Sequence, residues 1–458
     1  MEENIEVEIS VLKGDKLFNE NTPFIINLSS PELDSDTKRS HTDLICVIDS
    51  SMSMRGTKIN EVKKSLKILI DLMDQNDRLA LITFNKSATN YFDLQYLTDK
   101  NKIILKNKID LIENNRGTNI LSGLKNAVDI IKEEQKQNNK KRVSSVILLS
   151  DGKDTYRNDT QLADSLKNMT KGFGLSFTLH TFGYGYKYDE KILKKLACLR
   201  DGSFYFVENY KKVSEYFACV LGGCISVISN KGELNVKLLK NSCKIVKAFG
   251  GESLYEYKLE DDTFETNMLQ FLCGKEYSFV LEIKIDEKDV KIGEELLNID
   301  FNYEDIVSQK KKNKNYKYKY ELQSIDYMKA NEEYIRSQVY YVLDKVIQLF
   351  EKGEKDEAKK ILDDIKDWLE EKYKGENTNF LINVYKAYNI FKNDTSLVNT
   401  SIKFISSEIR QNQLKKQGCN MVFCNSVQMS LVKSISKHPF HNSMQFVKND
   451  LTKSIVFK

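Results

Sequence analysis

Apolar and polar positions change their spacing several times along this chain of 458 residues. Near the start, apolar side chains alternate with polar ones from about Ile5 to Leu28, which predicts short β-strands. From Asp43 to about Leu221, short continuous apolar runs alternate with segments in which apolar residues recur every three or four positions. Strands that alternate with helices in this way predict a mostly parallel, doubly wound α/β sheet.

Strand-like alternation returns from Ile225 to about Ile325. Together with the N-terminal strands it predicts a small β-sandwich into which the α/β domain is inserted. Helical spacing from Asp326 to about Leu414 predicts a helical bundle. We therefore expect five segments: residues 1–40 as the first sandwich strands, 41–221 as the α/β domain, 222–325 as the rest of the sandwich, 326–416 as the α-helical domain and 417–458 as a basic, irregular tail.

Polar residues follow two of the buried strands in the predicted sheet. The run Leu44 to Ile48 ends on Asp49, Ser51 and Ser53, and the run Val146 to Leu149 leads to Asp151. Ligands of open α/β sheets bind beyond the carboxyl ends of the strands, and Mg²⁺ prefers oxygen ligands. Asp and Ser are also favoured helix caps, so the first stretch alone permits either a metal loop or a capped helix.

Five positions, in matching order and strand context, resemble the metal-ion-dependent adhesion site of von Willebrand factor type A domains: Asp49, Ser51, Ser53, Thr118 and Asp151. The resemblance covers about Thr42 to Leu221. The run from Asp49 to Lys58 is similar to the intracellular and bacterial branch of that family. Plant proteins that join such a domain to a RING finger, and inter-alpha-trypsin-inhibitor heavy chains, look like relatives.

The resemblance implies a metal-dependent scaffold for protein–protein interaction. The resemblance also implies that Ser51, Ser53 and Thr118 contact Mg²⁺ or another divalent cation such as Mn²⁺ or Ca²⁺. Asp49 and Asp151 would then balance the charge of the cation through water. A partner's Asp or Glu would fill the remaining position. Arg116 stands where the family often has a second glycine. Two alternatives stay open: a structural assembly component with a stabilising metal, and an adaptor in ubiquitin-ligase recruitment, although no Cys-rich RING pattern occurs.

Enzymatic activity is not expected, because hydrolysis at a metal ion requires a general base beside the metal, and no His lies near these loops. A net charge of +4 gives no reason to expect a nucleic-acid partner. The run Lys310 to Tyr320 alternates lysine with tyrosine, which in an edge strand would place tyrosines inward and lysines outward.

The remaining features concern location and a second metal. No apolar run is long enough to span a membrane, and no export signal is evident, so the scattered cysteines are expected to be reduced thiols in the cytosol. In the tail, Cys419, Cys424, His438 and His441 hint at a zinc site, but the spacing departs from the usual pattern. A mobile or partner-ordered tail is the simpler expectation.

Overall fold

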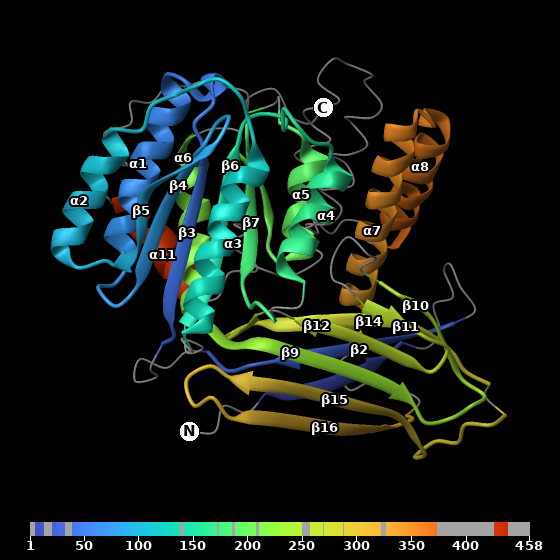
Figure 1. The fold of residues 1–458 in the computed structure, drawn as a ribbon. Coiled ribbons are helices and arrows are strands. Elements are labelled where there is room, and N and C mark those ends of the chain that lie inside the picture. Colours follow the sequence, from blue (N-terminus) through green and yellow to red (C-terminus); the bar gives the residue numbers. More distant parts are fainter. Residues whose placement is uncertain are drawn as a thin grey trace.

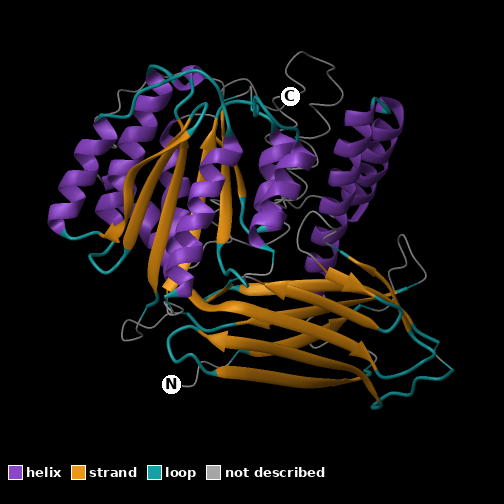
Figure 2. Cartoon of the chain, in the orientation of Figure 1, coloured by secondary structure: helices purple, strands orange, loops and turns teal. Residues whose placement is uncertain are grey.

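The computed structural model describes residues 5–12, 21–32, 39–137, 142–171, 174–185, 188–207, 210–249, 257–268, 270–286, 288–321, 327–372 and 426–437. These residues form an α/β domain, a β-sandwich that lies beneath it and a long helical hairpin that stands on the sandwich beside the α/β domain (Figure 1). Figure 2 shows the strands gathered in two separate groups, one enclosed by helices and one largely free of them.

The α/β domain is built on a six-stranded sheet in the order β5-β4-β3-β6-β7-β8. All neighbouring strands are parallel except β4 and β5, which are antiparallel. The central strands carry continuous apolar runs because both faces of the sheet are covered. The strands are β3 (His41–Asp49), β4 (Arg78–Phe84), β5 (Ala88–Tyr96), β6 (Arg142–Ser150), β7 (Thr178–Tyr184) and β8 (Phe204–Val207).

Helices pack on both faces of this sheet, as expected for a doubly wound fold. One apolar cluster joins one face of the sheet to α1 (Thr57–Leu72), α2 (Asp99–Asp110) and α6 (Tyr210–Ile225). A second cluster joins the other face to α3 (Ile120–Lys136), α4 (Asp159–Thr170) and α5 (Glu190–Leu199). Side chains of β3 alternate between the two clusters, since successive residues of a strand point to opposite faces.

The sandwich consists of two antiparallel sheets, and strands from both sides of the α/β domain contribute to it. The first has the order β1-β2-β14-β10, and the second has β11-β12-β9-β15-β16 with β13 paired to β9. The predicted insertion of a doubly wound domain into a sandwich is therefore confirmed. The strands are β1 (Glu6–Val11), β2 (Thr22–Ser29), β9 (Val227–Leu238), β10 (Lys244–Ala248), β11 (Tyr257–Leu259), β12 (Thr263–Met268), β13 (Phe271–Leu272), β14 (Glu276–Lys284), β15 (Glu295–Asp305) and β16 (Lys311–Lys319).

Strand β16 lies at the edge of its sheet, as the lysine-rich run suggested. Tyr318 in this strand and Tyr320 just after its end are buried, but Tyr316 is 40% exposed. The expectation that the tyrosines point inward is thus wrong for Tyr316.

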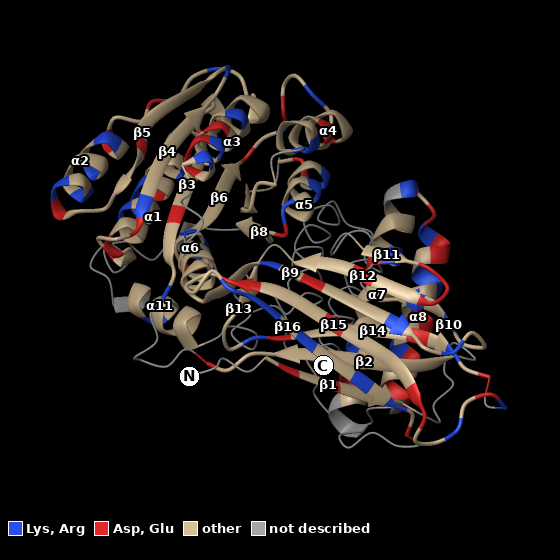
Figure 3. Cartoon of the chain, turned by 60° about the horizontal axis from the view of Figure 1, so that its bottom comes forward, with Lys and Arg blue, Asp and Glu red and all other residues tan. Residues whose placement is uncertain are grey.

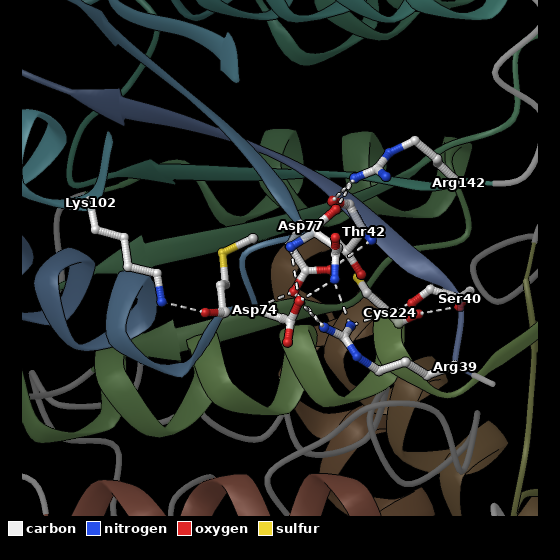
Figure 4. A network of polar contacts seen from close by, with 10 residues as sticks. Arg39, Ser40, Thr42, Asp74, Asp77, Lys102, Arg142 and Cys224 are labelled. Carbon is white, nitrogen blue, oxygen red and sulfur yellow. Dashed lines mark hydrogen bonds and ion pairs between the residues drawn. The ribbon is translucent and has the colours of Figure 1, made fainter. Parts of the chain in front are cut away.

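Polar contacts tie together the segments by which the chain enters and leaves the α/β domain (Figure 4). The guanidinium of Arg39 donates to both carboxylate oxygens of Asp77, at 3.1 and 3.0 Å. The Ser40 hydroxyl donates to the carbonyl of Cys224 at 3.3 Å. These contacts lie at the amino end of β3, which is the opposite end from Asp49.

The helices after the sandwich are α7 (Tyr327–Lys352), α8 (Lys355–Lys372) and α11 (Ser426–Lys437). Helix α7 contacts β1, β2 and β14, and α8 packs against α7. Helix α11 packs on α6, so the expectation of an irregular tail is wrong for these twelve residues. The rest of the expected bundle and all four zinc candidates, Cys419, Cys424, His438 and His441, lie outside the described residues.

The described part of the chain bears on the expected absence of a membrane span and on the cysteines. None of the helices in this part is both long and apolar enough to span a membrane. None of the six cysteines in this part is in a disulfide, and burial raises the pKa of Cys46 and Cys224 to about 12.

Candidate metal centre

The candidate residues converge at the carboxyl ends of two adjacent parallel strands. Strand β3 pairs with β6 in parallel register, which brings Asp49 at the end of β3 beside the turn that follows β6. A short 3₁₀ turn (Met52–Met54) then carries the chain from Ser51 to Ser53. The loop before α3 joins this edge, because the amide of Asn115 donates to the carbonyl of Ser50 at 2.9 Å.

Both carboxylate oxygens of Asp49 accept a hydrogen bond. Oδ1 accepts from the amide of Ser51 at 2.8 Å, and Oδ2 accepts from the hydroxyl of Ser150 at 2.6 Å. The side chain is fully buried. Such a carboxylate is fixed in place and can hold a metal's water ligands without contacting the metal itself.

The helix-capping alternative for this stretch is wrong. The residue that precedes α1 is Gly56, which has no side chain to offer as a cap. Ser51 precedes the 3₁₀ turn, but its side chain makes no capping hydrogen bond there. The hydroxyls of Ser51 and Ser53 are instead turned toward each other and toward Asp151.

Ser51, Ser53 and Asp151 form a short chain of oxygen atoms. The two serine hydroxyl oxygens are 2.9 Å apart, and the hydroxyl of Ser53 donates to Oδ1 of Asp151 at 2.7 Å. Oδ2 of Asp151 is ion-paired with the ammonium of Lys58. Asp49 and Asp151 together with Lys58 thus leave one net negative charge at the centre.

Thr118 reaches the same edge from the loop between α2 and α3. Its carbonyl accepts from the amide of Thr155 at 2.8 Å, and its amide donates to the hydroxyl of Thr155 at 3.1 Å. A Cβ atom placed on Gly152, the residue after Asp151, would lie 3.7 Å from Oγ1 of Thr118. The Thr118 hydroxyl therefore faces the start of the Asp151 turn, and it makes no hydrogen bond within the described residues.

Burial governs the acidity of Asp49. Desolvation raises the pKa of its carboxyl to about 6. The hydrogen bonds from Ser150 and Ser51 lower this pKa, and the nearby carboxylate of Asp151 raises it slightly. A buried carboxylate with a raised pKa and a second carboxylate beside it is a site that gains from a bound cation.

The donor set fits a small hard cation. Within the described residues no group of three or more His, Cys, Asp or Glu side chains is arranged to hold a metal. Here the donors are instead hydroxyls and carboxylates, the oxygen ligands that Mg²⁺ prefers. The 2.9 Å between the serine oxygens is close to the edge of about 3 Å expected for an octahedron with ~2.1 Å metal–oxygen bonds.

Some supporting residues were not assigned a role from the sequence. Ser150 orients Asp49, Lys58 neutralises Asp151, and the side-chain amide of Asn114 donates to the carbonyl of Ser51 at 3.0 Å. Asp154 fixes the loop after Asp151, because its carboxylate accepts backbone N–H groups, including that of Ile120 at 2.8 Å. The only available signal was adjacency to the predicted ligands.

Comparison with known proteins agrees with this geometry. Residues 43–218 match the von Willebrand factor type A domain family. This part of the chain is a von Willebrand factor type A domain. An uncharacterised protein of Synechocystis sp. is 26% identical over 239 residues, which cover 51% of this chain and 54% of that protein. The human inter-alpha-trypsin inhibitor heavy chain H2 is 29% identical over 158 residues, which cover 34% of this chain and 17% of the heavy chain.

These shares mean that the chain spans only part of its curated relatives. Two solved structures match over nearly its whole length and support the fold. The von Willebrand factor type A protein from Catenulispora acidiphila has a TM-score of 0.65 at 14% identity, with 90% of this chain and 97% of that one covered. The ArnB paralog VWA2 from Sulfolobus acidocaldarius has a TM-score of 0.56 at 17% identity, with 90% and 99% covered.

Proposed function

We propose that this protein is a metal-dependent scaffold that binds a carboxylate of a partner protein at its type A domain. Ser51, Ser53 and Thr118 would hold Mg²⁺ through their hydroxyls, and Asp49 and Asp151 would balance its charge through water. The bound cation would supply a Lewis-acidic position for an Asp or Glu side chain of the partner. The observation that carries this proposal is the oxygen cluster in which the Ser53 hydroxyl lies within hydrogen-bond distance of both the Ser51 hydroxyl and the Asp151 carboxylate.

The charge of the cluster supports a role for an anionic ligand. With one net negative charge from Asp49, Asp151 and Lys58, a divalent cation would leave the centre with one positive charge. An incoming carboxylate would neutralise that charge. His41 begins β3, at the end opposite to the candidate metal centre. His180 lies within β7, and its Nδ1 accepts a hydrogen bond from the amide of Ser203. Neither histidine of the described residues therefore lies at this edge as a general base.

Metal binding is the first step to test. Titration calorimetry with Mg²⁺ or Mn²⁺ should give binding that Ser53→Ala weakens at least about tenfold, because one of three neutral ligands is lost. Ser87→Ala is a matched control, since Ser87 is an exposed serine on a neighbouring loop of the same edge. Equal metal affinity in both variants would contradict the assignment.

Partner binding is the second step. A fluorescein-labelled Gly/Ser peptide with one central Asp should bind in Mg²⁺, and its Asn counterpart should not. EDTA or Asp49→Ala should abolish the binding. A metal that raises the melting temperature while the Asp peptide never binds would favour the structural alternative instead.

A further inference from the structure

Four exposed cationic side chains surround the candidate metal centre. Arg55 lies two residues after Ser53, Arg116 two before Thr118, and Lys153 two after Asp151. Lys86 belongs to the loop between β4 and β5, and a Cβ atom placed on Gly117 would lie 3.2 Å from the Cα of Lys86. We call Arg55, Lys86, Arg116 and Lys153 the cationic rim.

The four members of the rim lack a neutralising carboxylate within the residues that the structure describes, where none of them is in an ion pair. The nearby acidic residues are otherwise engaged. Asp151 pairs with Lys58, Asp154 accepts three backbone N–H groups, and Glu113 interacts with Lys63.

Elsewhere on the domain, several lysines are paired. Half-buried Lys67 and Lys106, for example, form ion pairs with Asp110 and Asp71 at the α1–α2 surface. Figure 3 shows basic and acidic residues interspersed along these helices. Because the whole chain carries a net charge of only +4, four unpaired cations around one site are a local concentration of charge.

The rim stands on loops that are fixed to one another. The amide of Asn119 donates to the carbonyl of Asn85 at 2.7 Å, and the amide of Thr155 donates to the carbonyl of Thr118 at 2.8 Å. The loops that carry Lys86, Arg116 and Lys153 are therefore held in a set arrangement.

Two large side chains beside the metal centre are exposed as well. Met52, between the two serines, is 43% exposed, and Tyr156, next to Thr155, is 49% exposed. Met and Tyr are enriched at protein interfaces. This edge of the sheet therefore combines the candidate metal centre, unpaired cations and exposed interface-type residues.

We propose that the partner segment is an acidic peptide, in which a central carboxylate binds the metal while flanking Asp or Glu residues contact the cationic rim. This inference rests on the proposed function and specifies its partner. Such flanking charges act mainly on the rate of association and on specificity, and salt screens them.

Three labelled peptides test the inference on the full-length protein in Mg²⁺. The first has a central Asp flanked by Glu residues, the second has the same Asp flanked by Gly and Ser, and the third has Glu flanks around a central Asn. At low salt the first should bind at least about tenfold more tightly than the second, and this ratio should shrink as salt rises. The third should lose most of the affinity.

Charge reversal of the rim supplies the second arm. Combining Lys86→Glu, Arg116→Glu and Lys153→Glu should remove the preference for Glu flanks while Mn²⁺ still binds at least as tightly as in the wild type, because added carboxylates attract a cation. A control with the same change in net charge reverses three exposed lysines far from the site, Lys100, Lys171 and Lys284, and should keep the preference.

The outcomes separate this inference from the function on which it rests. Metal-dependent binding of both Asp peptides with equal affinity, or a preference that survives reversal of the rim, overturns the acidic-partner inference and leaves the function standing. The acidic-partner inference is also overturned if the Glu-flanked peptides bind without metal or without the central Asp. Binding of a single-stranded oligonucleotide as tightly as the first peptide overturns it as well. Failure of every peptide to bind in a metal-dependent way overturns the proposed function itself.

Discussion

Two buried aspartates on the same strand have opposite environments. Asp43 accepts from Arg78 at 2.8 and 2.6 Å and from Arg142 at 2.6 Å, so two guanidinium groups neutralise it. Asp49, six residues along β3, receives hydrogen bonds only from uncharged groups and lies near the carboxylate of Asp151. The first carboxylate therefore stabilises the fold, and the second destabilises the metal-free protein.

Asp49→Asn should stabilise the metal-free protein at neutral pH. Because the folded-state pKa is raised from 3.8 to about 6, the folded state binds the proton more tightly than the unfolded state. The wild type therefore loses stability as pH rises from about 4 to about 6, by about 3 kcal/mol, and the loss stays constant above that range. Urea unfolding in EDTA should show the variant about 1–3 kcal/mol more stable at neutral pH and nearly equal to wild type at about pH 4.

Two controls accompany this measurement. Asp93→Asn removes an exposed carboxylate on β5 and should leave the difference between the two pH values unchanged. Added Mg²⁺ should stabilise the wild type and not Asp49→Asn. A variant less stable than wild type at neutral pH in EDTA would contradict the expected sign.

Asp43→Asn should have the opposite effect. The side chains of Arg78 and Arg142 are only 8% and 6% exposed, so neutralising Asp43 leaves two poorly solvated cations. Breaking a buried ion pair by removing one partner costs about 3–5 kcal/mol, although Glu134 still pairs with Arg78 and reduces the effect. The free energy of unfolding at neutral pH, measured beside that of Asp49→Asn, checks the contrast. Equal and small changes in both variants would refute it.

The sequence was sufficient to bring the five candidate residues to one edge, because their positions after buried strands follow from strand periodicity. It was not sufficient for Ser150 or Lys58. Their roles depend on which carboxylate oxygen each one faces, and that is set by the register of β3 against β6 and by the orientation of α1. Residue spacing carries no such information.

Among the elements, α11 is the helix that the sequence did not indicate. It docks on α6 at a glycine: a Cβ atom on Gly222 would lie 2.8 Å from the Cα of Gln428. The side-chain amide of Gln428 donates to the carbonyl of Cys219 at 3.0 Å, and Ile435 packs with Ile68 and Ala218. A short helix whose stability depends on a glycine two hundred positions away leaves little local signal.

Ile435→Asp should release α11 from the domain. Burying an isoleucine contributes about 1.5–3 kcal/mol, and a carboxylate in its place adds a desolvation cost. Hydrogen exchange should then accelerate in α11 and on the exposed face of α6. Ser434→Asp is the matched control, because the neighbouring Ser434 is exposed. Unchanged exchange in Ile435→Asp would show that this packing does not hold α11.

Release of α11 also bears on the metal centre through α6. Helix α11, docked along α6, would oppose any shift of α6 that accompanies ligand binding, and the two equilibria would then be linked. The exchange experiment should therefore be repeated in Mg²⁺ with the Glu-flanked peptide.

For the whole molecule, the two chain crossings between the domains lie at the end of the sheet remote from the metal centre. The insertion was predictable because strand-like alternation flanks the α/β segment on both sides. The partition of strands between the two sheets was not, since β14 pairs with β2 and β15 pairs with β9, and such distant pairings leave no trace in local periodicity.

Arg39→Ala should weaken the coupling between the two domains. The Arg39 side chain is 26% exposed, whereas that of its partner Asp77 is fully buried and also accepts the amides of Thr42 and Asp74. Losing the guanidinium leaves Asp77 with those two donors alone, at a cost of about 1–3 kcal/mol. Because Arg39 lies where the chain crosses from the sandwich, calorimetry should show a thermal transition that is broader than that of the wild type or split. The control is Arg55→Ala, which removes an unpaired arginine at the opposite end of the sheet and should leave the wild-type transition unchanged. Identical calorimetric traces for the two variants would mean that the Arg39–Asp77 pair does not couple the domains.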